Sequence, residues 1–414
     1  MPALQPVRGT RDLLPDDSRR RRHIEAIAFE IAERYGFGEI STPVFEFTDV
    51  FARTLGDASD IVTKEMYTFC DRGGESLTLR PENTAGVVRA FVSNGLAQQL
   101  PLKLFYRGPM FRYERPQKGR LRQFHQVGVE LLGVADPVAD AEVIALGADV
   151  LAALGLADRV VLELNTLGDA ESRAAYRQVL VDYLGRHRDR LSADSRVRLE
   201  RNPLRILDSK DEGDRAVIAG APLITDSLNP GSRAFFEELL ACLDRAGVGY
   251  RHNPRLVRGL DYYCHTAFEF TTEALGAQGT VLAGGRYDGL VEQMGGPPTP
   301  GTGWAAGVER LMMLVDESPP PRRPIAVVAH GSAHAGLAFA VGQRLRRAGL
   351  VVDVAYQGSL GKRLKRANRL NARAAVILGE DELSRQAVVV RDMDSGAQEE
   401  VLLAALEGHL GAFR

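Results

Sequence analysis

The segment from Arg107 to Gly133 constrains the fold more than any other part of this 414-residue chain. It begins with the run FRYER, passes through a Pro-Gln-Lys-Gly turn and returns as the alternating run RQFHQVGVELLG. This pattern predicts an antiparallel hairpin with a long tip. Between residues 112 and 122 a single carboxylate, Glu114, faces five cations, which are Arg112, Arg115, Lys118, Arg120 and Arg122. That density of arginine predicts a polyanionic ligand, either nucleotide phosphate or an RNA backbone, and a solvated basic loop is the alternative.

The composition is that of a soluble protein with two or three domains and a sizeable core, with 45% hydrophobic and 26% charged residues. No apolar run approaches the roughly 20 residues of a membrane span, and the first residues, MPALQPVRGTRDLLP, lack the apolar stretch of a secretion signal. The three cysteines (Cys70, Cys242 and Cys264) form no CxxC pair, which argues against a zinc site and a disulfide framework. We therefore expect a reduced cytoplasmic protein without a membrane segment or a metal site built by a protein motif. The net charge of −2 means that any RNA must be contacted by local basic patches.

The first half of the chain predicts a helix followed by many strands. Residues 16–35 carry apolar residues at helical spacing, with Asp16 or Asp17 as the cap and Gly36 as the end. A strand interrupted by Pro43 follows over residues 38–47. Strands dominate from there to residue 133, and a helix is expected over residues 139–155.

The second half predicts helices, then strands, then a separate domain. Charged, leucine-rich helical segments fill residues 165–250, and strands return over residues 256–292. The proline-rich run ESPPPRRP (317–324) predicts a stiff linker. Beyond it, the apolar strands PIAVVAH, VVDVAY, AAVILG and AVVVRD alternate with helices expected over residues 333–348, 360–372 and 398–411, which is typical of a compact α/β domain.

The helix expected over residues 360–372 is strongly basic. With Arg373 just beyond it, this segment holds six cations and no acid, and the other five are Lys362, Arg363, Lys365, Arg366 and Arg369. Either RNA contact or a solvated basic face explains such a pattern.

Five sequence blocks together resemble one enzyme family. The hairpin block, FRxERPQxGRxRQFHQ, is similar to motif 2 of the class II aminoacyl-tRNA synthetases in the form found in bacterial histidyl-tRNA synthetases. The other blocks follow in the family's order and are TLRPENTAG (78–86), RLVRGLDYY (255–263), AGGRYDGL (283–290) and GTGWAAGVERL (301–311). Residues 16–47 resemble motif 1, which builds the dimer interface in this family, although a generic helix–strand unit gives the same pattern.

The resemblance implies an α+β catalytic domain with a mainly antiparallel sheet, interrupted by a helical insertion, and a C-terminal α/β anticodon-binding domain. The catalytic domain is then expected over residues 1–320, with the insertion at about 165–250, and the anticodon-binding domain over residues 321–414. The activity implied is the activation of L-histidine with ATP to histidyl-adenylate and its transfer to the 3′ end of tRNA(His), releasing AMP and pyrophosphate. ATP is a substrate in this reaction, Mg²⁺ is bound with it, and the protein is expected to be a homodimer.

Activation of an amino acid requires cations around the reacting phosphate, because negative charge grows there while pyrophosphate leaves. The resemblance places Arg112 on the α-phosphate, Arg310 on the γ-phosphate and Arg258 across the reacting centre, so that Arg258 and Arg112 are the candidate catalytic residues. A structural salt bridge in a strand-rich core is the alternative for each arginine.

Histidine needs acceptors for its ammonium and partners for both ring nitrogens. The family's positions for the amino group match Glu82, Thr84 and Gln126, those for the ring match Glu130 and Tyr263, and those that line the pocket match Tyr262 and Tyr287. Strand periodicity independently places Gln126, Gly128 and Glu130 on one face, with the glycine leaving space between two polar side chains. Neither His125 nor His265 is assigned a role.

RNA contacts are expected at two places, the hairpin tip and the basic C-terminal helix. The residues are Lys118, Arg120 and Arg122 in the tip and Lys362, Arg363, Lys365 and Arg366 in the helix. The chain departs from common family residues at Asn83, Cys264, His265 and Trp304, which leaves the fine shape of the pocket open.

Two rival readings concern proteins that share this resemblance but do not charge tRNA. One is the regulatory, synthetase-like subunit of ATP phosphoribosyltransferase, which lacks the C-terminal RNA-binding domain and has eroded motifs. The other is a synthetase-like domain that senses uncharged tRNA inside a stress kinase. The intact arginines and the terminal α/β domain argue against the first, and the lack of a kinase segment in this sequence argues against the second.

Overall fold

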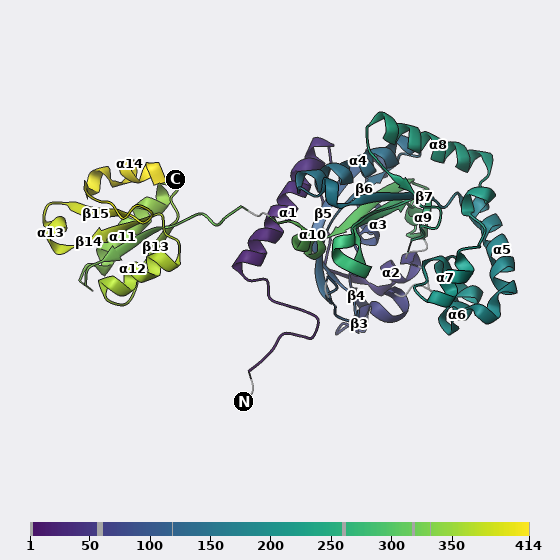
Figure 1. Ribbon diagram of the computed structural model, residues 1–414, viewed down its shortest axis with the longest axis horizontal. Coiled ribbons are helices and arrows are strands. Elements are labelled where there is room, and N and C mark those ends of the chain that lie inside the picture. The colour runs from purple at the N-terminus through teal and green to yellow at the C-terminus, as the bar shows by residue number, and fades with distance from the viewer. Residues whose placement is uncertain are drawn as a thin grey trace. The chain divides into compact units, whose positions relative to one another are not determined.

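The computed structural model describes residues 3–55, 61–117, 119–258, 262–316, 319–331 and 333–413. The chain forms two compact units, Met1–Ser318 and Pro319–Arg414 (Figure 1). Within the described residues no helix combines the length and the apolar character needed to cross a membrane.

The large unit is built around an eight-stranded sheet with the order β1-β5-β6-β11-β10-β9-β7-β8. Its central pairings are antiparallel, and only the pairings at the two edges are parallel. The mainly antiparallel sheet is therefore confirmed. The strands span β1 Gly38–Glu39, β5 Leu102–Phe111, β6 Gln123–Leu132, β7 Val161–Thr166, β8 Arg251–His252, β9 Cys264–Thr271, β10 Thr280–Arg286 and β11 Gly301–Gly307.

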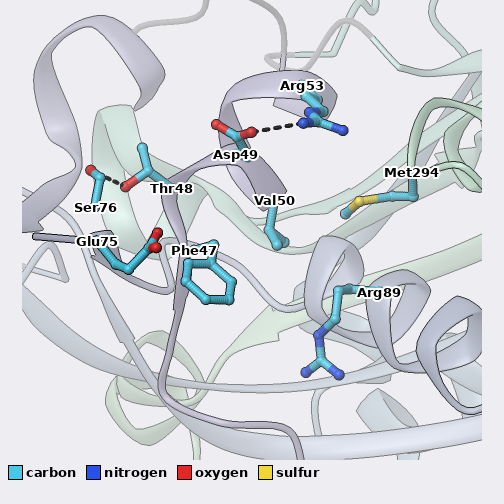
Figure 2. A pocket seen from close by; sticks show the side chains of 9 residues that line it. All are labelled: Phe47, Thr48, Asp49, Val50, Arg53, Glu75, Ser76, Arg89 and Met294. Carbon is cyan, nitrogen blue, oxygen red and sulfur yellow. Dashed lines mark hydrogen bonds and ion pairs between the residues drawn. The ribbon is translucent and has the colours of Figure 1, made fainter. Parts of the chain in front are cut away.

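The single strand expected over residues 38–47 is in fact two strands, which belong to two different sheets. The second of these sheets has three strands. Only β1 joins the large sheet, whereas β2 (Phe45–Phe47) pairs with β4 (Ser76–Leu79), which also pairs with β3 (Tyr67–Cys70). A hollow of about 490 Å³ lies beside this small sheet. Figure 2 shows that Phe47, Arg89 and Met294 approach it from separate segments.

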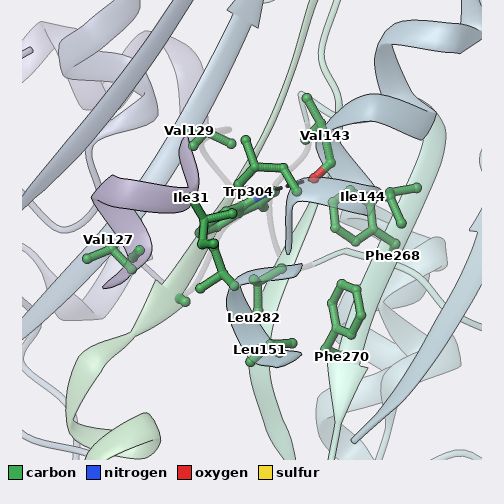
Figure 3. Packing of buried hydrophobic residues seen from close by; sticks show 14 of the residues in the cluster. Ile31, Val127, Val129, Val143, Ile144, Leu151, Phe268, Phe270, Leu282 and Trp304 are labelled. Carbon is green, nitrogen blue, oxygen red and sulfur yellow. Dashed lines mark hydrogen bonds between the residues drawn. The ribbon is translucent and has the colours of Figure 1, made fainter. Parts of the chain in front are cut away.

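Four helices cover one face of the large sheet and enclose its core. They are α1 (Pro15–Arg34), α4 (Pro137–Ala153), α8 (Pro230–Arg245) and α10 (Val308–Leu314). Figure 3 shows Trp304 of β11 packed among the aliphatic residues of this core, where its indole nitrogen donates to the Val143 carbonyl at 3.0 Å. Trp304 is thus a core residue that fixes α4 against the sheet.

The helix expected over residues 16–35 is α1, but its cap differs from the prediction. Leu14 occupies the cap position without a side-chain hydrogen bond, and Pro15 follows as the first helical residue. Asp16 and Asp17 instead lie in the first turn, where carboxylates favour the helix dipole. Gly36 has a φ of 81°, a left-handed conformation that allows the chain to turn after the helix.

Helices interrupt the region from 38 to 133, where strands with short turns were expected to dominate. These are α2 (Thr48–Leu55), a π-helical turn (Ile61–Glu65), α3 (Thr84–Ser93) and a 3₁₀ turn (Leu96–Gln99). Most of α3 is buried, including its whole first turn, so its sequence has no polar face that would reveal a helical period.

The segment between β7 and β8 is helical, as expected for the insertion. It contains α5 (Ala170–Arg186), α6 (Ala193–Arg201), α7 (Glu212–Ile218) and α8 (Pro230–Arg245). Each of these helices begins at a residue whose side chain accepts a backbone N–H, namely Asp169, Ser192, Asp211 and Asn229.

The small unit is an α/β domain with the sheet order β13-β12-β14-β15-β16. One predicted helix, 398–411, is wrong in its first part. Residues Gln398–Leu402 form the edge strand β16, in which Val401 is buried and the two glutamates are exposed. Only Leu406–Leu410 (α14) are α-helical. The other elements are β12 (Ile325–Ala329), β13 (Val352–Val354), β14 (Ala374–Leu378), β15 (Ala387–Asp392), α11 (Ala335–Arg347), α12 (Leu360–Arg369) and α13 (Glu380–Ser384).

Candidate active site

One cavity of about 350 Å³ in the large unit gathers residues from all five sequence blocks. Its walls come from the β5–β6 hairpin, from the start of α3 and from the strands β9, β10 and β11. The predicted site residues that line it are Glu82, Thr84, Arg112, Gln126, Arg258, Tyr262, Tyr263, Tyr287 and Arg310.

Glu130 lies beneath this cavity and is completely buried. The Thr84 hydroxyl donates to one of its carboxyl oxygens at 2.6 Å, and the Tyr287 hydroxyl donates to the other. Burial raises the pKa of Glu130 to about 8, so this carboxyl is mostly protonated at pH 7. A methyl group at Gly303 would lie 2.0 Å from Glu130 Oε2, so only glycine fits beside it.

The face that carries Gln126, Gly128 and Glu130 is arranged differently from the prediction. The space above Gly128 is filled by Tyr106 of the neighbouring strand, whose hydroxyl oxygen would lie 2.4 Å from a Cβ at position 128. Tyr106 is fully buried, and the carboxyls of Glu130 and Glu82 add to the desolvation that raises its pKa. The sequence does not reveal this tyrosine, because its position follows only from the register that pairs it with Gly128.

Glu82 and Gln126 offer acceptors at the same end of the cavity. The Glu82 carboxylate accepts the N–H groups of Thr84 at 2.7 Å and Ala85 at 2.9 Å, which fixes it at the start of α3. Burial raises the pKa of Glu82, while these backbone donors and Arg112 oppose the shift. The side-chain oxygen of Gln126 has no hydrogen-bond partner among the described residues, so it is available to an ammonium group.

Two of the three predicted arginines are held by backbone carbonyls. Arg112 donates from Nε to the Pro81 carbonyl at 2.8 Å, and its guanidinium lies over the Phe124 ring at 5.3 Å. Arg310 donates from Nη1 to the Thr280 carbonyl at 2.6 Å, and burial lowers its pKa. Arg112 Nη1 also lies 3.9 Å from the Glu114 carboxylate, whereas the carbonyl that holds Arg310 carries no formal charge.

The third arginine, Arg258, forms an ion pair with Glu269 and lies over the Tyr263 ring at 5.4 Å. Burial lowers the pKa of Arg258, but Glu269 together with Tyr263 and Tyr262 outweighs it, so the net shift is upward. The Nε atom of Arg258 is buried without a hydrogen-bond partner in the described part of the chain. Arg258 thus forms a salt bridge and also lines the cavity, so the geometry is compatible with a structural role and with a catalytic role.

The hairpin tip is tied to the N-terminal segment. The N–H of Arg122 donates to the Gly9 carbonyl at 2.8 Å, and its guanidinium lies 3.8 Å above the Tyr113 ring. Arg120 pairs with Glu114 at 3.1 Å. Lys118 lies outside the described residues, and Arg120 also lines the candidate active-site cavity.

In the basic helix α12, the structure corrects one predicted RNA contact. Arg363 is 6% exposed and donates to the Ala329 carbonyl of β12 at 2.5 Å, so its guanidinium cannot reach a phosphate. Helical period places it on the buried face with Ala367. Lys362, Lys365 and Arg366 are exposed, and Arg366 pairs with Asp353 at 2.9 Å.

Histidine and cysteine residues build no metal centre in the part of the chain that the structure describes, where no cluster of three potential ligands occurs. His125 bonds to Glu309 at 2.8 Å, and His265, at a φ of 44°, stacks on Phe235 at 4.5 Å. Asn83 accepts the Thr42 hydroxyl at 2.7 Å. These contacts are local and structural.

Comparison with known proteins places this geometry in a family. The family model of histidyl-tRNA synthetase matches residues 9–311, and the model of the anticodon binding domain matches residues 325–411. Histidine–tRNA ligase of Rhodospirillum rubrum is 66% identical over the whole of both chains, and that of Gluconacetobacter diazotrophicus is 60% identical over 99% of both. The crystal structure of apo histidyl-tRNA synthetase from S. aureus is 36% identical, with a TM-score of 0.82 over 98% of this chain and 99% of that one. The chain therefore belongs to the histidyl-tRNA synthetase family.

Proposed function

We propose that the protein charges tRNA(His) with L-histidine in two steps at the cavity described above. In the first, the carboxylate of histidine attacks the α-phosphorus of ATP, which forms histidyl-adenylate and releases pyrophosphate. In the second, a hydroxyl of the terminal ribose of tRNA(His) attacks the acyl carbon, and AMP leaves. The observation that carries this proposal is the convergence of Arg112, Arg258 and Arg310 on one cavity that also holds the Glu130 network.

The arginines supply fixed positive charge to the phosphates. Arg112 and Arg258 are assigned to the α-phosphate, where charge develops as the phosphorus is attacked, and Arg310 to the γ-phosphate. Because backbone carbonyls orient two of these guanidinium groups before any ligand binds, little reorganisation is needed during the reaction.

The acceptors around α3 suit the amino acid. Glu82 and the free oxygen of Gln126, with the Thr84 hydroxyl, are assigned to the ammonium group. Glu130 and Tyr263 are assigned to the imidazole, with Tyr262 and Tyr287 closing the pocket around it. The Glu130 carboxyl and the imidazole ring of histidine both gain or lose a proton near neutral pH, so their protonation states are matched.

Mg²⁺ is assigned to the phosphates of ATP. Among the described residues the cavity wall holds separate carboxylates, which pair with arginines, and no cluster that would enclose the ion. This fits the usual behaviour of Mg²⁺, which binds phosphate oxygens, water and one or two carboxylates. The ion supplies charge neutralisation of the departing pyrophosphate.

ATP–pyrophosphate exchange measured with each amino acid in turn tests the proposed function. Exchange should depend on histidine, because only its side chain can pair with both Glu130 and Tyr263. A regulatory subunit of the ATP phosphoribosyltransferase type would give no exchange with any amino acid, and that result would exclude the proposal.

The domain boundary and the RNA contacts belong to the same proposal. Residues 1–320 carry activation, with the insertion at about 165–250, and residues 321–414 bind the anticodon arm. The RNA-contact set is Lys118, Arg120 and Arg122 in the hairpin and Lys362, Lys365 and Arg366 in α12. The three free cysteines suit a reducing cytoplasm.

Truncation after residue 322 should separate the two activities. The two units pack separate cores, so residues 1–322 should keep histidine-dependent exchange. Charging of tRNA(His) should fall by roughly tenfold or more, since contacts to RNA phosphates dominate binding. Aminoacylation by both chains at equal concentration measures this difference, and equal charging would remove the role assigned to α12.

We also propose a homodimer, and we place its interface at the strand end of the segment 16–47 instead of at its helix. The apolar face of α1 is buried within its own unit, so it does not form the interface. The three-stranded sheet instead exposes one apolar face, with Phe45, Phe47 and Phe69 being 48%, 57% and 45% exposed. Phe47 also reaches the adjacent hollow (Figure 2). Such a patch is typical of a protein–protein interface.

Light scattering at micromolar concentration should give twice the chain mass of 45.2 kDa. The variant Phe47→Glu should be monomeric, because a buried unpaired carboxylate opposes association. Tyr356→Glu is the matched control, since this aromatic is 76% exposed in the other unit and should leave the dimer intact. A wild-type monomer would contradict the assignment.

A further inference from the structure

The loop between β8 and β9, residues 253–263, carries Arg258, Tyr262 and Tyr263, and it is bonded to the helical insertion at both ends. At its start, Arg255 donates from Nη2 to the carbonyls of Ala219 at 2.8 Å and Ala221 at 3.3 Å, just after α7. We call this segment the β8–β9 loop; its residues 259–261 lie outside the described structure.

At the end of the loop, the backbone carbonyl of Tyr263 accepts a hydrogen bond from Nη1 of Arg173 in α5. Arg173 is half-buried and lies in the first turns of this helix, whose N-terminus is capped by Asp169. The contact joins a guanidinium to a main-chain oxygen, so it fixes the path of the backbone instead of balancing a charge. It thereby connects a helix of the insertion to a residue of the proposed histidine pocket.

The position of Tyr263 matters to two groups of the site. Its ring lies 4.6 Å from that of Tyr262, and the guanidinium of Arg258 lies 5.4 Å above it. On the other side, a Cβ at Gly285 would lie only 2.9 Å from the Tyr263 ring, so β10 leaves no spare room there. A shift of the Tyr263 backbone would therefore move its ring relative to both Tyr262 and Arg258.

The start of the loop has a second side-chain anchor, whereas the end passes directly into β9, whose first residue, Cys264, pairs with Arg286 of β10. Asn165 of β7 donates to the Leu256 carbonyl at 2.9 Å, which holds the start of the loop to the sheet even without Arg255. Arg173 is the side chain that holds the Tyr263 carbonyl among the residues that the structure describes. Loss of Arg173 should thus disturb the loop more than loss of Arg255.

We propose that Arg173 is a positioning residue through which the helical insertion sets the β8–β9 loop and, with it, the histidine pocket. Arg173 touches neither substrate and acts through Tyr263. The inference rests on the proposed function, since it assumes that Tyr263 and Arg258 serve histidine activation. It follows that displacement of the insertion is transmitted to the histidine site.

Arg173→Met compared with Arg177→Met tests the inference by kinetics. Arg177 lies one turn further along α5, and both arginines line a cavity of about 380 Å³ beside the insertion. Arg177 is exposed and has no hydrogen bond or ion pair among the described residues. In pyrophosphate exchange, Arg173→Met should raise the KM for histidine about tenfold, the effect of losing one charged hydrogen bond, with the KM for ATP close to wild type. Arg177→Met should behave as wild type. Arg173→Lys should recover part of the loss, because an ammonium also donates to a carbonyl.

A second measurement reports on the loop itself. Hydrogen exchange in peptides covering residues 253–263 should be faster in Arg173→Met than in Arg177→Met, while peptides of the sheet remain unchanged. If Arg173→Met does not fold, Arg173→Lys and Arg173→Gln take its place in both measurements. Equal histidine KM values and equal loop exchange for the variants at 173 and 177 would overturn the inference. Absence of histidine-dependent exchange in the wild type would instead overturn the proposed function, so the two failures are distinguishable.

Discussion

Arg258→Ala should reduce single-turnover formation of histidyl-adenylate by at least about a hundredfold, since arginines in comparable phosphoryl-transfer reactions contribute roughly 10³–10⁵ in rate. The charge that this guanidinium meets develops only as the α-phosphorus is attacked, so its loss falls on rate more than on binding. The dissociation constant for histidine should change modestly, because Glu82, Gln126 and Glu130 remain in place. Rapid-quench measurement of adenylate at saturating ATP gives the rate.

The salt bridge with Glu269 provides the matched control for this prediction. If Arg258 served only to stabilise the fold through that pair, Glu269→Gln would be as harmful as Arg258→Ala, because either change breaks the bridge. If Arg258 serves the reaction, Glu269→Gln should keep most of the rate, with Thr280 still bonded to residue 269. Arg258→Lys should recover little, since one ammonium does not reproduce the planar guanidinium. Near wild-type adenylate formation by Arg258→Ala would remove the central cation from the mechanism.

Local patterns in the sequence predicted those parts of the fold that local forces determine. The β5–β6 hairpin was predicted because alternation and a turn lie in one continuous segment. The helices of the insertion carry both a capping residue and an exposed polar face. By contrast, α3 and β16 were missed because long-range packing decides their conformation. Because most of α3 is buried, its sequence has no polar face that would indicate a helix. The sequence of β16 is also compatible with a helix, but its pairing with β15 makes it a strand.

The motifs named residues that the structure brings to one cavity, but they did not name the partners of those residues. Resemblance to the family identified Glu130, yet not Tyr106 or Arg173, whose places depend on strand register and on how the insertion packs. Likewise, the charge of Arg363 indicated RNA contact, whereas its position on the helix places it beneath the surface. Composition alone does not distinguish an inward-facing cation from an exposed one.

Glu130→Gln should weaken histidine binding by roughly tenfold to a hundredfold, the cost of leaving a buried ring nitrogen without its matched partner. Glutamine keeps the size of the side chain but cannot exchange a proton with the imidazole. The KM for ATP should stay close to wild type, because the phosphate-binding arginines are untouched. Exchange assays that vary each substrate separately measure both constants, and a parallel rise in both would mean that Glu130 supports the whole cavity instead of the ring.

The stability of the empty protein distinguishes a binding role of Glu130 from a structural one. The pKa of this carboxyl is about 8 in the folded protein, above its ordinary value of 4.5, so folding takes up a proton between these pH values. The contribution of Glu130 to stability is therefore complete at low pH and is lost as the pH rises towards 8. Glutamine carries no such penalty, and the melting temperature of Glu130→Gln at pH 8 should equal or exceed that of the wild type. A carboxyl kept for the fold would give the opposite result, with a variant that melts lower at every pH. A buried acid that destabilises the ligand-free protein at neutral pH fits a role in which bound histidine shares its proton.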